Sequence, residues 1–126
     1  MIYYASRTGN VRRIIGRLAL PNKEIQAGVH VSEPFLLFTY TDGLGAVPEL
    51  VKAFMSQHHK QCKGIIASGN SNFGINNFCG AADKLSRHYG IPIVRKIELY
   101  GFSGDDEAIK IYYEQVINSE KIFAVK

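Results

Sequence analysis

Residues 64–74 read GIIASGNSNFG, an apolar run that leads directly into a loop of small polar residues. An uninterrupted apolar run such as residues 64–67 is typical of a strand buried on both faces of a parallel sheet. Residues 68–74 are rich in hydroxyl, amide and glycine groups, with one aromatic ring at Phe73. Ligands of open α/β sheets bind outside the carboxyl ends of the strands. The stretch therefore predicts an α/β fold with a ligand-binding loop at this strand end.

The rest of the chain alternates apolar runs with helical patterns, which indicates parallel strands joined by crossover helices. The predicted strands cover residues 1–5, 24–27, 35–39, 64–67 and 91–99. The predicted helices cover residues 10–20, 47–58, 77–89 and 105–117, with Pro48 in the first turn of the second helix and Asp105 capping the last. The expected helix between the second and third strands is missing. We expect one domain, residues 1–126, folded as a three-layer α/β sandwich with a five-stranded parallel sheet of order 2-1-3-4-5.

Length and composition predict a protein without a membrane span that folds without a disulfide. A chain of 126 residues, of which 46% are hydrophobic, can bury a sizeable core without a cross-link. No apolar run approaches the ~20 residues of a membrane span, and residues 1–5 lack the features of a signal peptide, so we expect a cytoplasmic protein. Cys62 and Cys79 are expected to be buried free thiols. Neither is followed six positions later by Arg, which excludes a phosphatase-type nucleophile loop.

The charge balance is mildly basic. Fifteen Lys and Arg against eleven Asp and Glu give a net charge of +4, which indicates a solvated surface rather than a nucleic-acid site. Four arginines crowd the first part of the chain: Arg7, Arg12, Arg13 and Arg17. No aromatic RNA-binding motif accompanies them, so they favour an anionic protein or ligand. The adjacent His58 and His59 are expected on the surface, and the sequence indicates no metal site in this chain.

Three polar loops follow predicted strands, at residues 6–10, 40–45 and 68–74, and should converge at one edge of the sheet. Residues 6–11 have the form of a phosphate-binding loop. Ser6 and Thr8 offer hydroxyl groups, and the amides of residues 9–11 begin a helix whose amino end attracts anions. The alternative is an ordinary turn that caps the helix. The loop lacks both the Gly-Lys-Ser/Thr ending of a P-loop and the Gly-x-Gly-x-x-Gly of dinucleotide-binding folds.

Several side chains near these loops allow two interpretations. Tyr40, Phe73 and Phe78 either stack on a planar aromatic ligand or pack into the core. Asp42 is either a charge beside that ligand or a turn residue that faces solvent. Cys79 either touches the ligand or is a small core residue.

Two sets of motifs resemble known families. Residues 6–10, SRTGN, resemble the phosphate loop of flavodoxins. Residues 64–74, together with EPFLL at 33–37, AVP at 46–48 and KIELYG at 96–101, are similar to the NrdI family, the flavodoxin-like activators of class Ib ribonucleotide reductase. The resemblance covers nearly the whole chain. It departs at residues 41–45, TDGLG, where some members have consecutive glycines, and this difference bears on the redox potential.

The resemblance implies a flavodoxin-like fold that binds FMN. It also implies an accessory flavoprotein, reduced by a separate electron donor, whose flavin reacts with O2 to form a superoxide-type oxidant. The partner is then the small, dimetal-carrying subunit of the reductase, in which the oxidant assembles a dimanganese–tyrosyl radical cofactor. The alternatives are a general electron-transfer flavodoxin and, in another class, a non-catalytic flavodoxin-like binding or regulatory module. The expected cofactor-binding residues are Ser6, Arg7, Thr8, Gly9, Asn10, Val11, Thr39, Tyr40, Thr41, Asp42, Gly43, Gly45, Ser68, Gly69, Asn70, Asn72, Phe73, Gly74, Phe78 and Cys79.

Overall fold

The computed structural model describes residues 1–74 and 77–119. Its strands are β1 (Ile2–Tyr4), β2 (Asn22–Glu24), β3 (Phe35–Tyr40), β4 (Cys62–Gly69) and β5 (Ile93–Glu98). Its α-helices are α1 (Asn10–Leu18), α2 (Glu49–His58), α3 (Gly80–Tyr89) and α4 (Ser103–Tyr112). The short helices are η1 (His59–Gln61), η2 (Ser71–Phe73) and η3 (Tyr113–Asn118), of which η3 continues α4 as a π-helix.

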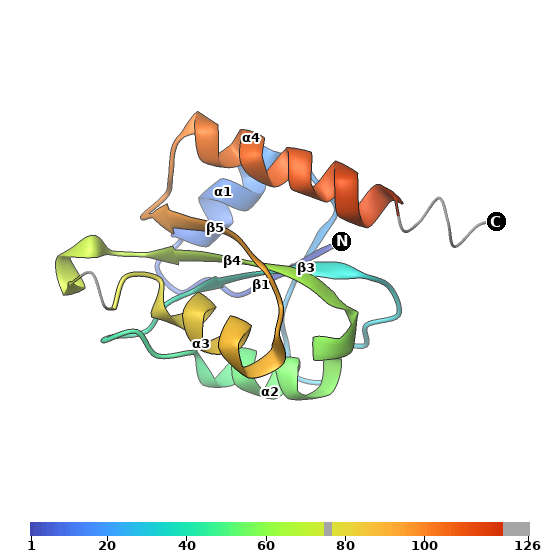
Figure 1. Ribbon diagram of the computed structural model, residues 1–126, viewed down its shortest axis with the longest axis horizontal. Helices are drawn as coiled ribbons and strands as arrows, with labels where there is room; N and C mark the ends of the chain where they lie inside the picture. The colour runs from blue at the N-terminus through green and yellow to red at the C-terminus, as the bar shows by residue number, and fades with distance from the viewer. Residues whose placement is uncertain (75–76, 120–126) are drawn as a thin grey trace.

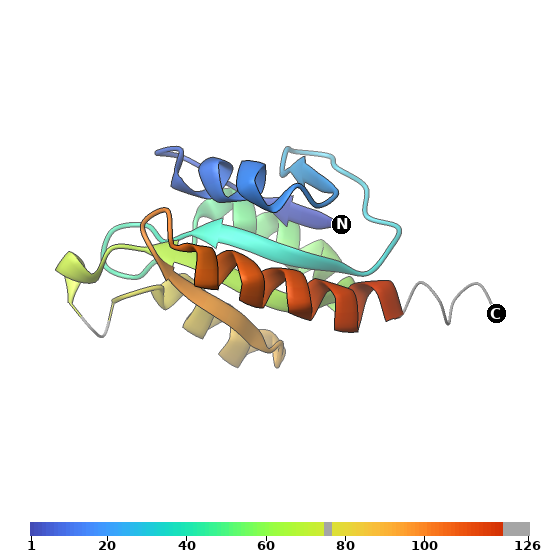
Figure 2. The same cartoon turned by 90° about the horizontal axis from the view of Figure 1, so that it is seen from above.

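The strands form one parallel sheet of order β2-β1-β3-β4-β5, as the sequence predicts. Helices α1 and α4 cover one face of this sheet, and α2 and α3 cover the other (Figure 1). Viewed from above, α1 lies beside α4 in front of the sheet (Figure 2). The predicted three-layer α/β sandwich is therefore confirmed.

The apolar runs of the central strands serve both faces of the sheet. In β3, Phe35 and Leu37 pack under α2 and α3, whereas Leu36 and Phe38 pack under α1 and α4. All four are fully buried. Successive residues of a strand point to opposite faces, so a central strand covered on both sides needs apolar residues at every position. This requirement explains why the runs lack the alternation of a half-exposed strand.

Several element boundaries differ from the sequence prediction because residues adopt the left-handed conformation. The first helix ends at Leu18, two residues early, since Ala19 has a φ of 53° and closes the helix with a bond to Ile15 O. The third helix begins at Gly80 rather than at residue 77, because Cys79 has a φ of 52°. Pattern-based prediction does not anticipate a positive φ at these non-glycine residues.

Three further boundaries also moved. The weak edge strand predicted at residues 24–27 lies at Asn22–Glu24, where it pairs with β1. Pro48 is the N-cap of α2 rather than a residue of its first turn. Helix α4 begins at Ser103, so the predicted cap Asp105 lies inside its first turn.

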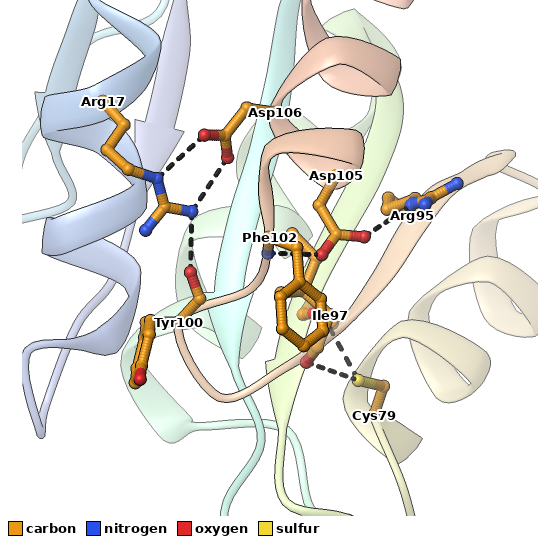
Figure 3. Close-up of polar contacts among 9 residues, drawn as sticks. Arg17, Cys79, Arg95, Ile97, Tyr100, Phe102, Asp105 and Asp106 are labelled. Carbon is orange, nitrogen blue, oxygen red and sulfur yellow. Dashed lines mark hydrogen bonds and ion pairs between the residues drawn. The ribbon is translucent and has the colours of Figure 1, made fainter.

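Asp105 still caps α4, from within the helix. Its carboxylate accepts a hydrogen bond from the Phe102 N–H (2.9 Å) and an ion-paired bond from Arg95 on β5 (2.8 Å; Figure 3). The neighbouring Asp106 pairs with Arg17 of α1 (2.8 Å), which joins the two helices of this face. Two adjacent carboxylates thus fix the start of α4 to both β5 and α1.

Both cysteines are buried free thiols, as predicted. Burial raises the pKa of the Cys62 and Cys79 thiols to about 11. At neutral pH both groups are therefore protonated and poorly nucleophilic. Among the helices of residues 1–74 and 77–119, none is long and apolar enough to cross a membrane.

Candidate functional site

A cleft of about 340 Å³ lies at the carboxyl edge of the sheet, where the loops after β1, β3, β4 and β5 meet. This is the edge at which open α/β sheets bind ligands. The volume falls within the range usual for small-molecule sites. The residues that line the cleft are Ser6, Arg7, Thr8, Asn10, Val11, Tyr40, Thr41, Gly43, Ser68, Gly69, Asn70, Phe73, Asn77 and Leu99.

Most of the expected site residues therefore line one cleft, and the others are not part of its lining. Gly9 is the N-cap of α1, with a φ of 95° that turns the chain into the helix. The buried Thr39 donates its hydroxyl to the Tyr40 carbonyl (2.8 Å). Gly45 has a φ of 93° and packs closely against Gly80, the first residue of α3. These three residues shape the loops without lining the cleft.

The remaining expected residues lie in and after the loop that follows β4. Asn72 is exposed and donates its backbone N–H to the Asn70 side chain (2.9 Å). Gly74 adopts a φ of 96°. Phe78 packs against the core under α2 and α3. Cys79 is fully buried, with Sγ 3.4 Å from the Ala67 carbonyl. Of the two roles that the sequence allows, contact with the ligand or a small core residue, it has the second.

Two residues that line the cleft were not predicted from the sequence. Asn77 was assigned to a helix, but it lies in the turn before α3 and donates to the Phe73 carbonyl (2.8 Å). Leu99 follows β5 and has a φ of 53°. The rule that ligands bind at the carboxyl ends of strands applies to β5 as well, and that signal could have identified Leu99.

The loop after β1 leaves polar groups without protein partners. Ser6 Oγ is buried and accepts or donates no hydrogen bond among the described residues, and the same is true of Thr41 Oγ1 in the loop after β3. Both residues line the cleft. A buried hydroxyl without a partner is costly. The two hydroxyls therefore suit a ligand with a hydrogen-bonding group. Ser6 belongs to the loop that leads into α1, whose amino end favours an anionic one.

The loop after β3 is a tight turn with an ion pair at its start. Asp42 and Ala46 form a small antiparallel bridge, which holds Gly43 at the cleft. Asp42 Oδ1 is buried and lies 2.6 Å from Arg7 Nη1, so the two side chains form an ion pair. The guanidinium of Arg7 also lies 5.2 Å from the centre of the Tyr40 ring. Asp42 thus faces Arg7, rather than the solvent or the open cleft.

The loop after β5, residues 99–102, is tied to the rest of the protein. Ser68 Oγ donates to the Leu99 carbonyl (2.6 Å), and the Leu99 N–H donates to Gly69 (2.8 Å). The Tyr100 carbonyl accepts a bond from Arg17 (2.6 Å; Figure 3). This loop therefore has a fixed course beside the cleft.

Exposed apolar side chains lie on the loops that meet at the cleft, and two of them, Phe73 and Leu99, line it. Leu44 is 73% exposed, Phe73 51% and Phe102 75%, and Leu99 and Tyr100 are also exposed. We call these five residues the apolar rim. They come from the loops after β3, β4 and β5. A concentration of exposed apolar groups is typical of a surface that binds another protein.

The crowded arginines form a less basic surface than the sequence suggests. Arg7 faces Asp42, Arg12 faces Glu24 (2.7 Å) and Arg17 faces Asp106. Arg13 lies over the Tyr100 ring, 4.2 Å from its centre. Opposing carboxylates therefore cancel much of this positive charge.

The described residues contain no cluster of His, Cys, Asp or Glu suited to a metal ion. His59 instead stacks on Tyr89, with ring centres 4.4 Å apart.

Comparisons with known proteins agree with this geometry. A family model described as NrdI flavodoxin-like matches residues 2–111. The chain is 37% identical over 128 residues to Protein NrdI of Bacillus licheniformis, and the match covers 99% of this chain and 97% of that protein. Among solved structures, a short-chain flavodoxin associated with a non-canonical PDU bacterial microcompartment is similar, with a TM-score of 0.68 and 20% identity over 94% of this chain and 95% of that one. The structural similarity shows the fold alone.

Proposed function

Because this chain belongs to the NrdI flavodoxin-like family, we propose that it is the oxidant-supplying partner of a class Ib ribonucleotide reductase. The family binds FMN and is tied to ribonucleotide reductase. The proposed activity is the supply of a superoxide-type oxidant, made from O2 at reduced FMN, to the small subunit of the reductase. That subunit then assembles its dimanganese–tyrosyl radical cofactor. A separate electron donor reduces the flavin.

The observation that carries the proposal is the pair of buried, unpartnered hydroxyls of Ser6 and Thr41 in one cleft. FMN has a phosphate that needs hydrogen-bond donors and a flat ring that needs aromatic and backbone contacts. Ser6, Thr8 and Asn10 would hold the phosphate together with the first amides of α1, whose first turn carries no acidic residue. Residues of the loop after β1 thus fit the phosphate end of the cofactor.

Residues of the loops after β3 and β4 fit the ring. Tyr40 and Phe73 line the cleft, and Phe73 is half exposed, so its face is free to stack on a planar group. Gly43 and Gly69 let the backbone approach the ring closely. When bound, FMN supplies the electrons that reduce O2, and the protein orients the ring and limits its contact with water.

The apolar rim supports a docking surface for the reductase around the same cleft. A partner that covers Leu44, Phe73 and Phe102 would exclude water from the cleft mouth, so that an oxidant formed there passes to the partner rather than to solvent. The loops at residues 40–45 and 68–78 would form the centre of the interface, although residues 75–76 lie outside the described residues. The rim adds the loop after β5 to this surface.

The test is reconstitution of the reductase small subunit. That subunit, loaded with Mn(II), is mixed with the FMN-replete protein, a reductant and O2, and the tyrosyl radical is measured by electron paramagnetic resonance. We expect a radical that requires both the protein and O2, with a yield that superoxide dismutase and catalase added to the solution do not abolish. Flavin oxidation without radical formation would contradict the proposal and would instead support a general electron-transfer role.

A pair of matched variants tests the docking surface. Leu44→Lys changes the apolar rim, whereas Leu50→Lys changes an exposed leucine of α2 that lies outside it. We expect Leu44→Lys to retain FMN and lose most of the radical yield, and Leu50→Lys to behave as the wild type. Equal yields from the two FMN-replete variants would place the partner elsewhere.

A further inference from the structure

The ion pair between Arg7 and Asp42 lies in the wall of the cleft. Arg7 lines the cleft directly. Asp42 does not, but its neighbours Thr41 and Gly43 do, and one of its carboxylate oxygens is buried. The pair therefore joins the loop after β1 to the loop after β3, with the cation on the cleft side and the carboxylate behind it. The guanidinium carbon also lies 5.2 Å from the centre of the Tyr40 ring, which holds Arg7 in the same place.

We propose that Arg7 is a positioning residue that neutralises Asp42 behind the cleft wall and thereby keeps the bound flavin easy to reduce. This inference rests on the proposed function, in which FMN occupies the cleft. Two-electron reduction of FMN takes up two electrons and one proton and leaves a net negative charge on the ring. A carboxylate within several ångströms opposes that charge, and a cation placed between the two cancels the effect.

Arg7 could also contact the phosphate of FMN, and the two roles are separable by measurement. The phosphate keeps the same charge when the ring is reduced. Loss of a phosphate contact therefore weakens the binding of oxidised and reduced FMN by the same factor. The ratio of the two dissociation constants, reduced over oxidised, changes only through groups that sense the charge of the ring. A purely structural role of Arg7 would not change this ratio.

The experiment measures this ratio in Arg7→Gln, Asp42→Asn and the double variant. The dissociation constant of oxidised FMN comes from fluorescence titration, and the midpoint potential, measured against a reference dye with a chemical reductant, gives the ratio. We expect Arg7→Gln to raise the ratio about tenfold, which for a two-electron couple corresponds to a potential about 30 mV lower. Asp42→Asn should lower the ratio severalfold, and the double variant should return to within about twofold of the wild type.

A second ion pair supplies a matched control. Arg12 and Glu24 are 2.7 Å apart, against 2.6 Å for Arg7 and Asp42. Their side-chain exposures are 57% and 37%, against 60% and 31% for Arg7 and Asp42. Neither Arg12 nor Glu24 lines the cleft. Arg12→Gln and Glu24→Gln make the same changes of net charge, and we expect both to keep the ratio within about twofold of the wild type.

The outcomes separate this inference from the proposed function. Failure of the wild type to bind FMN would overturn both. If the wild type binds FMN, a ratio unchanged in Arg7→Gln would overturn the role of Arg7 and leave the proposed function standing. Shifts of the same sign in Arg7→Gln and Asp42→Asn, or an equal shift in the Arg12 control, would overturn it as well. Opposite shifts that cancel in the double variant would support it.

Discussion

The loop after β5 and the loops after β1 and β3 line different parts of one cleft, and they are held in different ways. At residues 99–102, backbone groups are bonded to Ser68, Arg17 and Asp105 of the protein itself. In the loops after β1 and β3, the buried hydroxyls of Ser6 and Thr41 have no partner among the described residues. The loop after β5 thus has its hydrogen bonds satisfied by the protein itself. The loops after β1 and β3 instead have buried hydroxyls that a ligand could bind.

This difference predicts which substitutions should change the affinity for the ligand and which should change the stability of the fold. A change in the loops after β1 and β3 should alter ligand affinity more than stability, because the groups concerned make few contacts within the protein. A change in the network behind the loop after β5 should lower stability and leave ligand affinity nearly unchanged. Four experiments test this contrast.

The largest expected effect is on cofactor affinity, from Thr8→Glu. Thr8 is an exposed residue of the cleft lining, so the protein should fold normally. A carboxylate there would face the phosphate of FMN, and like charges in contact cost several kcal/mol. We expect the affinity for FMN to fall more than about 100-fold, measured by fluorescence titration and by the FMN content of the purified protein. The control is Ser32→Glu, which places the same charge at an exposed position outside the cleft lining and should bind FMN as the wild type does. Full FMN occupancy in Thr8→Glu would contradict the assignment of this loop to the phosphate.

The second experiment tests how the loop after β3 is supported. A Cβ at Gly80 would lie 2.8 Å from the Cα and the carbonyl oxygen of Gly45, so that Gly80→Ala must push the loop away from α3. We expect a loss of about 1–3 kcal/mol in the free energy of unfolding, together with weaker FMN binding. Gly16→Ala in α1 is the matched control, because nothing lies within 4 Å of its Cβ. That variant should gain up to about 1 kcal/mol from helix propensity. Urea unfolding measures the stability of both variants. If Gly80→Ala were as stable as Gly16→Ala, the loop after β3 could shift without a loss of free energy.

A smaller effect on stability is expected from Arg17→Met, which changes the network behind the loop after β5. This variant removes two bonds to Asp106 and one to the Tyr100 carbonyl. The pair is partly exposed, so we expect a loss of about 1–2 kcal/mol rather than the full value of a buried pair. FMN affinity should stay within about twofold of the wild type. Lys52→Met, which breaks an exposed pair with Glu49, should cost less than about 0.5 kcal/mol. An FMN affinity that falls together with stability in Arg17→Met would remove the distinction between the two regions.

The fold could be predicted because its signals are local. The apolar runs at residues 35–39 and 64–67 identify strands that are buried on both faces, and only central strands of a covered parallel sheet have that environment. The position of the cleft followed from the same reasoning, since parallel strands end at one edge. The polar loops of residues 6–10 and 68–74 were therefore placed together correctly.

The features that escaped prediction depend on contacts between distant residues or on unusual backbone angles. Nothing in the sequence near Asp42 indicates that Arg7 faces it. Cys79 and Leu99 take positive φ angles that few non-glycine residues adopt, and these angles set the start of α3 and the course of the loop after β5. Only the assembled sheet shows where such residues lie.

The smallest expected effect belongs to Arg13, which connects α1 to the apolar rim. Its guanidinium lies 4.2 Å from the centre of the Tyr100 ring, and at an exposed site such a contact contributes about 0.5–1 kcal/mol. We expect Arg13→Gln to lose no more than that in the free energy of unfolding and to bind FMN as the wild type does. Arg13 faces no carboxylate among the ion pairs of the described residues, unlike Arg7, Arg12 and Arg17. It is thus the member of the arginine group best able to attract an acidic partner.

Its effect on the partner should appear in the rate of association. We expect Arg13→Gln to slow association with the reductase small subunit about twofold at low salt and to have no effect at high salt, since rim charges mainly steer encounter and are screened by ions. Stopped-flow fluorescence over a range of salt concentrations measures this rate. Arg13→Lys is the control: it keeps the charge and should keep the rate, while it weakens the planar contact with Tyr100. If Arg13→Lys slowed association as much as Arg13→Gln, the geometry of Tyr100 rather than the charge of Arg13 would govern docking.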